Sequence, residues 1–215
     1  MSNNPFETFA DVYDRWYDDF PSVFASEVLA LRAVLPCPGD WVEVGVGTGR
    51  FAAELGIRTG IEPAEAMAAL ARRRGIDVIH GVAEALPLAS GSVDCVLFIT
   101  SLCFVDDIET ALEEAFRVLR PDGCCVIGLL PLDSALGQAT QARASEDHFF
   151  KNAHLRTKDE VLQTLQSTGF GLERSAQALW GSPQGFEGEL PSQKSGHDCG
   201  SFVAFRAVKT QLAAH

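Results

Sequence analysis

The chain has 215 residues, of which 47% are hydrophobic, and a formal net charge of −12 at pH 7. This length and composition are sufficient for the core of one domain, so we treat 1–215 as a single domain. The negative charge would repel a polyanion, so no nucleic acid is expected as a partner. We also expect a cytoplasmic protein with no membrane partner, because no apolar run approaches the roughly 20 residues that span a bilayer and the N-terminus lacks a basic-then-apolar leader.

Residues 1–36 are predicted to form a helical N-terminal cap. Aromatic residues cluster between Phe6 and Tyr17, and a second helical segment is expected from Ser22 to Leu35. Two interpretations stay open for this region. It could be a helical layer packed on a sheet, or a lid whose aromatic side chains close over a ligand.

From Trp41 onward, short β-rich runs alternate with helical patterns, which predicts an α/β fold with a parallel sheet and crossover helices over 37–130. The expected strands are Trp41–Val44, Thr59–Ile61, Asp77–His80, Val93–Ile99 and Cys124–Leu130. The expected helices are Arg50–Leu55, Ala64–Arg73, Ile108–Leu119 and, later, Lys158–Ser167.

The last part of the chain, 131–215, follows a different pattern. Two strand-like runs, Leu172–Trp180 and Phe202–Val208, have no helix between them, which predicts an antiparallel pair. The whole is then a Rossmann-like, seven-stranded, mostly parallel sheet with an antiparallel last strand and helices on both faces. The connection Gly181–Gly200 is long and rich in Gly, Pro and Ser, and is expected to be a structureless functional flap.

A glycine-rich segment connects the first predicted strand to the helix that follows it. Glu43 lies in the strand, and Gly45, Gly47 and Gly49 follow at alternate positions. Glycines allow a sharp turn and close approach to a ligand, and the helix start directs its free N–H groups toward that ligand. Arg50 stands where the G-x-G-x-x-G pattern of dinucleotide sites requires glycine, which argues against a nicotinamide cofactor.

A second acid, Glu62, lies at the end of the next predicted strand, 19 residues after Glu43. A carboxylate at this place can accept hydrogen bonds from both hydroxyls of a ribose. A glycine-rich loop alone is equally consistent with a tight structural turn. The loop, its place after a strand and the second acid together predict a nucleoside-like cofactor.

Five segments in chain order resemble the successive motifs of class I S-adenosylmethionine-dependent methyltransferases. The small-molecule branch that includes the ubiquinone and menaquinone biosynthesis enzymes is the most similar. The resemblance implies S-adenosyl-L-methionine as cofactor and a small-molecule methyl acceptor as the other substrate. The segments are Glu43–Phe51, Gly60–Met67, Gly81–Leu88, Ser92–Val105 and Arg117–Ile127.

The resemblance also implies roles for single residues in cofactor binding. Glu43 would help fix the methionine moiety, the three glycines would line it, and Glu62, followed by Pro63, would hold the ribose. Met67 could pack on the adenine or could be a core methionine. The implied cofactor-binding set is Glu43, Gly45, Gly47, Gly49, Glu62, Pro63, Met67, Ala83, Glu84 and Thr100.

The adenine contacts depart from the family pattern. Val82 stands where the family usually has Asp, so the acid for the adenine amino group is either missing or supplied by Glu84, next to Ala83. Thr100 follows the fourth predicted strand on the side where the acceptor is expected, and could contact a ligand or cap the strand.

The catalytic residues stay unassigned, because methyl transfer from a sulfonium needs alignment more than a dedicated base. His148, His154 and His197 could act as bases or be solvated loop residues. Acidic residues near the cap and the flap are consistent with a cationic amine as acceptor and equally with a solvated surface. The scattered cysteines lack C-x-x-C spacing, so free thiols and no metal are expected. A non-catalytic S-adenosylmethionine-binding protein and a nicotinamide oxidoreductase of related fold remain alternatives.

Overall fold

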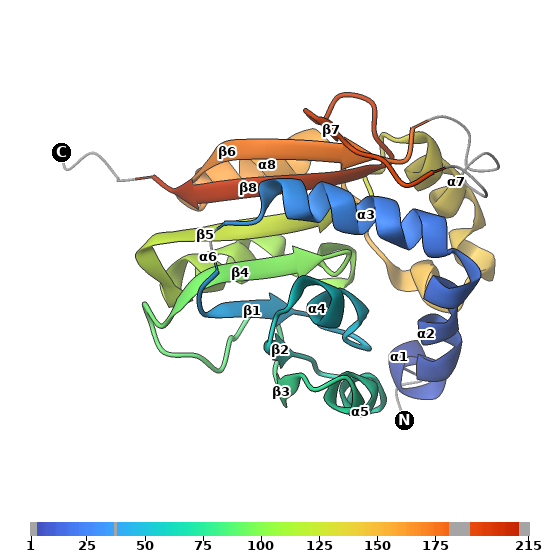
Figure 1. Ribbon diagram of the computed structural model, residues 1–215, viewed down its shortest axis with the longest axis horizontal. Coiled ribbons are helices and arrows are strands. Elements are labelled where there is room, and N and C mark those ends of the chain that lie inside the picture. The colour runs from blue at the N-terminus through green and yellow to red at the C-terminus, as the bar shows by residue number, and fades with distance from the viewer. Residues whose placement is uncertain (1–3, 37, 181–189, 211–215) are drawn as a thin grey trace.

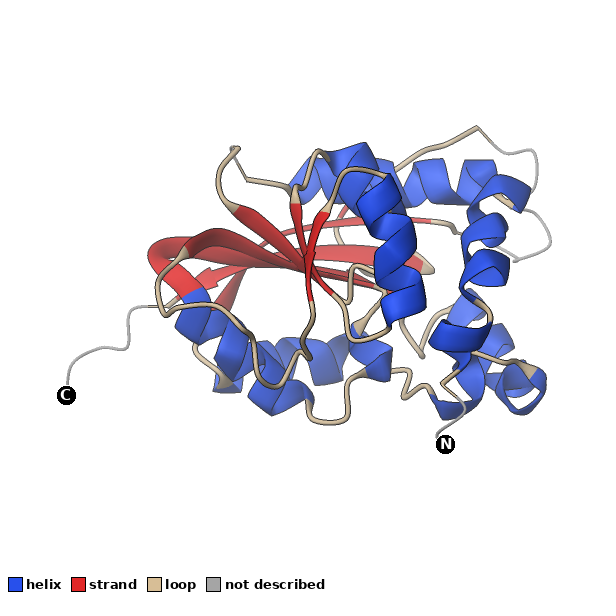
Figure 2. Ribbon diagram, turned by 90° about the horizontal axis from the view of Figure 1, so that it is seen from below, coloured by secondary structure: helices blue, strands red, loops and turns tan. Residues whose placement is uncertain are grey.

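The computed structural model describes residues 4–36, 38–180 and 190–210. Its centre is one eight-stranded sheet in the order β3-β2-β1-β4-β5-β8-β6-β7, with helices on both faces (Figures 1 and 2). The strands are β1 Trp41–Val44, β2 Thr59–Ile61, β3 Asp77–Ile79, β4 Val93–Ile99, β5 Leu119–Leu129, β6 Phe170–Ala178, β7 Lys194–Ser195 and β8 Phe202–Lys209.

The α-helices are α1 Pro5–Thr8, α2 Ala10–Asp19, α3 Pro21–Val34, α4 Arg50–Leu55, α5 Glu65–Arg73, α6 Ile108–Val118, α7 Ala135–Arg143 and α8 Lys158–Ser167. Three short 3-10 turns are η1 Leu102–Phe104, η2 Ala144–Glu146 and η3 Phe150–Asn152. In Figure 1, α3 crosses in front of the sheet, α6 and α8 lie behind it, and α1 and α2 lie beyond the carboxyl ends of the parallel strands.

The predicted sheet is confirmed in its directions and corrected in its strand count. Strands β3, β2, β1, β4 and β5 are parallel, and β8 is antiparallel to both β5 and β6. The eighth strand, β7, lies in the segment expected to be structureless, of which 181–189 lie outside the described residues. The buried Gln177 holds this segment, because its amide donates to Ser195 O and accepts from the Gly200 backbone N–H at 2.7 Å.

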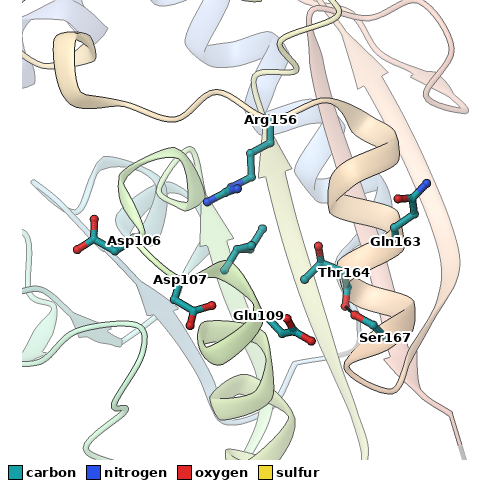
Figure 3. Close-up of a pocket in the computed structure, with 8 residues that line it drawn as sticks. Asp106, Asp107, Glu109, Arg156, Gln163, Thr164 and Ser167 are labelled. Carbon is teal, nitrogen blue, oxygen red and sulfur yellow. Dashed lines mark hydrogen bonds between the residues drawn. The ribbon is translucent and has the colours of Figure 1, made fainter.

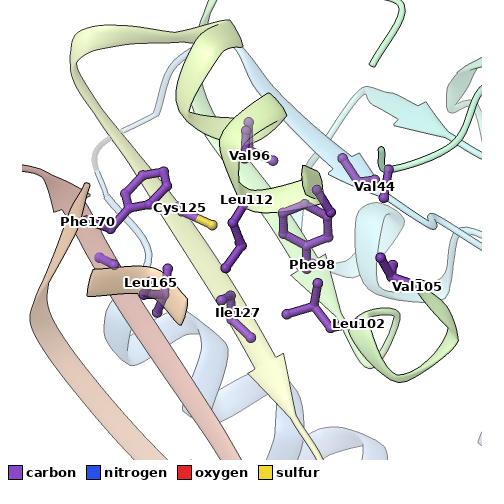
Figure 4. Packing of buried hydrophobic residues seen from close by; sticks show 14 of the residues in the cluster. Val44, Val96, Phe98, Leu102, Val105, Leu112, Cys125, Ile127, Leu165 and Phe170 are labelled. Carbon is purple, nitrogen blue, oxygen red and sulfur yellow. The ribbon is translucent and has the colours of Figure 1, made fainter. Parts of the chain in front are cut away.

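The strands pack by period-two alternation, with apolar side chains on both faces of the sheet. From β4, Val96 and Phe98 join the core on one side, while Cys95 and Leu97 join the core on the other. The first core contains Leu112 of α6 and residues of α8 (Figure 4), and the second contains residues of α3 and α4. Strands buried on both faces are typical of parallel sheets covered by crossover helices.

Two elements differ from expectation for local reasons. Strand β5 begins at Leu119, before the Pro-Asp-Gly turn expected to precede it, because Leu119 already pairs with Val93 of β4. The next residue, Arg120, forms a 2.6 Å ion pair with Asp94 of β4. Helix α7 was not predicted, since it has only one buried residue, Gly137, and no apolar periodicity. A side-chain cap starts it: Ser134 Oγ accepts a hydrogen bond from Gly137 N at 3.0 Å.

The described residues also show the state of the cysteines and the character of the helices. Five described cysteines carry free thiols, four of them buried: Cys95, Cys103, Cys124, Cys125 and the exposed Cys199. Among the described helices, none combines the length and apolar character needed to cross a bilayer.

Leu112 provides a test of the core between α6 and the sheet. Leu112 is fully buried, so Leu112→Ala is expected to lower the free energy of unfolding by about 2–5 kcal/mol through lost burial and a cavity. Leu172→Ala is the matched control, because Leu172 is 42% exposed and its truncation should cost well under half as much. Urea denaturation measures both, and equal losses would contradict this packing.

Candidate active site

The glycine loop leaves the carboxyl end of β1 in a left-handed conformation. Gly45, Gly47 and Gly49 have φ angles of 70°, 55° and 80°. A Cβ on Gly45 would lie 2.6 Å from the Ser101 Cβ, and one on Gly49 would lie 3.0 Å from Ala71. A Cβ on Gly47 would meet nothing closer than Gly45 O at 4.0 Å. Packing therefore requires glycine at the first and last positions, while the middle one faces open space.

Glu62 follows β2 and closes over the same loop. Its carboxylate accepts hydrogen bonds from Gly47 N and Ala64 N, each at 2.9 Å, and only 7% of the residue is exposed. Burial raises the pKa of Glu62, and the two backbone hydrogen bonds partly oppose that rise. The structure thus brings together Glu62, its neighbour Pro63 and the glycine loop, as the sequence predicted.

Glu43 lies at the end of β1, buried beneath the loop. Its Oε2 has no hydrogen-bond partner among the described residues. Burial raises the pKa of Glu43 well above its usual value, and the nearby Glu62 adds to the rise. A buried acceptor without a partner is costly, so this oxygen suits a ligand that brings a donor or a positive charge.

The remaining predicted residues lie at the edges of this site. Met67 is buried and packs with Ala10 and Ala64, which is the environment of a core methionine. Ala83 is buried in the core, while Glu84 accepts hydrogen bonds from the backbone N–H groups of the loop that follows η1, with Asp106 N at 3.0 Å. Glu84 is therefore occupied within the protein.

Thr100 lies just after β4, in a left-handed conformation with φ of 52°. Its hydroxyl donates to Ile99 O at 2.8 Å, and its backbone N–H donates to Gly128 O at the same distance. The next residue, Ser101, donates to Val44 O at 2.8 Å. The Ser101 bond holds the end of β4 against the end of β1, and the Thr100 N–H bond holds it against β5. Thr100 both caps the strand and lines a cavity.

Arg50 has a structural role that the sequence did not reveal. Its guanidinium forms hydrogen bonds to Asp14 at 2.9 Å and to Asp18 at 2.7 Å, both on α2. Arg74 binds the same Asp14 at 2.8 Å and also donates to Thr48 O. Burial alone would raise the pKa of Asp14, but the hydrogen bonds from Arg50 and its neighbours lower it to about 2. These ion pairs attach α2 to the glycine loop.

A cavity of about 780 Å³ lies between α2, α3, the carboxyl ends of β4 and β5, and the segment from α7 to η3. We call it the aromatic cavity. Thr100 and Gly128 line its inner end, and His148 lines its outer part. The ring of His148 stacks on the ring of Phe9, with 4.5 Å between the ring centroids. Its aromatic wall contains Tyr13, Trp16, Tyr17, Phe20, Phe149 and Phe150.

Glu27 of α3 also lines the aromatic cavity, and sequence reasoning missed it. Only 7% of the residue is exposed, and burial raises the pKa of its carboxyl to about 8. No described residue is hydrogen-bonded to it. The missed signal is positional: Glu27 lies between Val23 and Leu31 on the buried face of α3, where an apolar residue is expected.

A second, polar groove of about 380 Å³ lies between the start of α6 and α8 (Figure 3). Arg156 reaches over the start of α6 there and donates to Val105 O at 3.4 Å. None of the predicted site residues lines this groove, so it is separate from the site at the glycine loop.

Comparison with known proteins identifies the family to which this chain belongs. A model of the methyltransferase domain matches residues 42–127. An S-adenosylmethionine-dependent methyltransferase from Thermotoga maritima, named a possible histamine N-methyltransferase, is 39% identical with a TM-score of 0.91, over 96% of this chain and 99% of that one. An uncharacterised protein of Methanocaldococcus jannaschii is 34% identical over 96% of this chain and 99% of its own length.

The chain belongs to the S-adenosylmethionine-dependent methyltransferases. The methyltransferase therefore uses S-adenosylmethionine as its cofactor, and the alternative of a nicotinamide oxidoreductase is set aside. A ubiquinone/menaquinone biosynthesis C-methyltransferase of Methylobacterium nodulans is 35% identical over 45% of this chain and 44% of its own. The resemblance to that branch is thus confirmed for part of the methyltransferase, whereas the Thermotoga and Methanocaldococcus proteins match it along nearly its whole length.

The features of the loop fit this cofactor. The amino acid end of S-adenosylmethionine carries an ammonium group, and the buried Glu43 oxygen without a partner is an acceptor of the kind that such a group needs. The ribose carries two hydroxyls, and the Glu62 carboxylate directly after β2 is an acceptor of the kind that hydroxyls need. The open face over Gly47 provides space without side-chain atoms.

Gly45→Ala is expected to weaken binding of S-adenosylhomocysteine to the methyltransferase at least about tenfold, because its Cβ would displace Ser101 and move the loop. Gly56→Ala is the matched control. Gly56 also has a left-handed φ, of 76°, but nothing lies within 4 Å of an added Cβ, so it shares the backbone strain without the clash. Isothermal titration calorimetry measures both variants, and equal affinities would contradict the prediction.

The buried Glu27 predicts a pH dependence of stability. Because its folded pKa of about 8 lies above the usual 4.5, its stabilising contribution is complete below about pH 4.5 and is lost as pH rises through 8. Glu27→Gln does not titrate, so its stability relative to wild type should rise between pH 5 and pH 9, by roughly 2–5 kcal/mol.

Urea denaturation of the empty protein across this pH range provides the measurement. The control is Glu113→Gln, which removes an exposed carboxyl from α6 and should give a curve parallel to that of the wild type. A Glu27→Gln curve that is also parallel to wild type would show that Glu27 titrates normally.

Proposed function

We propose that this methyltransferase transfers the methyl group of S-adenosylmethionine in line to a small-molecule acceptor held in the aromatic cavity. The observation that carries the proposal is the position of the cavity. Thr100 lines it, and the adjoining Ser101 is bonded to Val44 at the start of the glycine loop. The acceptor and the cofactor would therefore meet where β1 and β4 end.

The cofactor-binding residues in this proposal are those of the loop and the two strand ends. Glu43 would bind the amino acid end, Gly45, Gly47 and Gly49 would shape the loop, and Glu62 would bind the ribose. The proposed set is completed by Pro63, Met67, Ala83, Glu84 and Thr100. Met67 would act indirectly, by packing with Ala10 and Ala64, and Glu84 would act by holding the loop that follows η1.

When bound, S-adenosylmethionine supplies a methyl carbon that is already activated by its sulfonium. The protein then has to orient the acceptor atom and exclude water. Alignment of two reactants can contribute about 7–11 kcal/mol to lowering a barrier, so a dedicated acid or base is optional and depends on the acceptor. Tyr13 and Tyr17 from α2 cover the cavity, and the Arg50 ion pairs keep α2 in place. His148 lines the outer part of the cavity, and its action as a base stays a prediction.

The similar proteins do not share one acceptor. The Thermotoga protein is named a possible histamine N-methyltransferase and the Methylobacterium protein a quinone C-methyltransferase. Nitrogen and carbon acceptors are thus both represented, and the choice for this chain has to come from the side chains of its own cavity.

Glu62 provides the test of the cofactor site. Wild-type protein should bind S-adenosylhomocysteine saturably, and Glu62→Ala should bind about 10- to 100-fold more weakly, because a buried hydrogen-bonding carboxylate is lost. Glu65→Ala is the control, since Glu65 forms an exposed ion pair with Arg72 and lies outside the loop. Calorimetric titration provides the measurement. Wild-type protein that fails to bind, or a Glu62→Ala variant that binds equally well, contradicts the proposed site.

A further inference from the structure

The aromatic cavity combines an apolar wall with one buried acid. Among its described lining residues, Glu27 is the only charged side chain that is buried, whereas Arg143, Glu146, Asp147 and His148 are exposed at the outer part. Asp147 is already occupied there, since its carboxylate accepts hydrogen bonds from Phe149 N and Phe150 N. Glu27 is therefore the ionisable group that a ligand inside the cavity would meet.

Glu27 has a location that a structural role does not explain. It takes a core position on α3 and has no hydrogen-bond partner among the described residues. A buried carboxyl without a partner costs stability, and an apolar side chain at the same place would remove that cost. A ligand that brings a positive charge would provide the missing partner.

The surrounding rings favour the same kind of ligand. Tyr13 and Tyr17 lie near Glu27, and the Glu27 charge is among the causes, after burial, that raise the pKa of each phenol, to about 12 for Tyr13. Both tyrosines are therefore neutral, and their hydroxyls lie 3.3 Å apart. Neutral aromatic faces attract cations through their quadrupoles, most strongly where water is excluded.

We propose that the methyl acceptor is an amine that enters the aromatic cavity as an ammonium ion, pairs with the Glu27 carboxylate and contacts the rings of α2. This inference rests on the proposed function for the cavity and adds the chemical class of the acceptor. An anionic acceptor would oppose ionisation of Glu27, and a neutral alcohol or phenol would bring no positive charge to pair with its carboxylate.

The ion pair between Glu27 and the ammonium also places a proton acceptor beside the nitrogen, which N-methylation of an ammonium requires. An ammonium nitrogen has no free electron pair, so one N–H bond must break before attack. Glu27 can accept that proton, forming a carboxylic acid and a neutral amine. The nitrogen pair then forms the new N–C bond as the C–S bond breaks, and that electron pair stays on sulfur. The methylated ammonium leaves Glu27 protonated, and this proton passes to water when the next ammonium binds.

The test measures binding of 2-phenylethylamine and histamine, with 2-phenylethanol as the neutral analogue, in the presence of saturating S-adenosylhomocysteine. Wild-type protein should bind the amines about 10- to 100-fold more tightly than the alcohol. Glu27→Gln should reduce this preference to less than about threefold and leave S-adenosylhomocysteine affinity unchanged. Glu113→Gln, on the outer surface of α6, should keep the wild-type preference.

Proton release on amine binding provides a second measurement. It would not depend on Glu27 if the role of that residue were purely structural. In the empty cavity at pH 7, Glu27 is mostly protonated, since its pKa is about 8. Binding of an ammonium should therefore release close to one proton, measured by calorimetry in buffers of different ionisation enthalpy, and the variant should release almost none. The other titratable groups lining the cavity are Tyr13, Tyr17, Cys103, Arg143, Glu146, Asp147 and His148, and the variant retains all of them.

The outcomes separate this inference from the proposed function. Amines that fail to bind the wild type, bind no better than the alcohol, or bind Glu27→Gln equally well overturn the amine assignment, even where the cofactor binds normally. Failure of S-adenosylhomocysteine to bind overturns the proposed cofactor site instead. Circular dichroism of Glu27→Gln confirms folding, and Glu27→Asp, which keeps the charge, should retain part of the preference for amines.

Discussion

The left-handed turn at Gly45 determines how the ends of the central strands meet. Because Gly45 has no Cβ, Ser101 can lie against it and donate to Val44 O, which holds the end of β4 beside the end of β1. The glycine loop starts on one of these strands, and the inner end of the aromatic cavity lies at the other. The distance between the glycine loop and the aromatic cavity therefore depends on a contact that no larger residue at position 45 would allow.

Charge pairs extend this arrangement to the N-terminal helices. Arg50 begins α4 at the end of the loop, and its ion pairs with Asp14 and Asp18 attach α2 to it. α2 contributes much of the aromatic wall, whereas α3 packs along the sheet face. The two interpretations of residues 1–36 thus apply to different helices: α3 forms a layer, and α1 and α2 cover the carboxyl ends of the strands. Whether α2 opens as a lid stays a prediction.

Three buried carboxyls lie near the carboxyl ends of the parallel strands, and burying each of them lowers the stability of the fold. Burial raises the pKa of Glu27, Glu43 and Glu62. Glu62 recovers part of the cost through two backbone hydrogen bonds. One oxygen of Glu43 is buried without a partner among the described residues, and Glu27 lines the aromatic cavity without a hydrogen bond to any of them. Proteins retain such groups where a ligand completes them, because in the empty state an apolar residue would be more stable.

The sequence by itself determined which segments form the parallel strands, the antiparallel end, the glycine loop and the placement of Glu43 and Glu62, because period-two burial and the need for glycine in a left-handed turn are local properties. The order of the strands in the sheet came from the tertiary structure. Only the tertiary structure decided the surroundings of Glu27 and the contacts made by Arg50 and Gln177. Each acts through partners or a cavity built from distant segments: Arg50 reaches residues 32 and 36 positions away. A local pattern shows that a charge is out of place in a helix, and only packing shows what surrounds it.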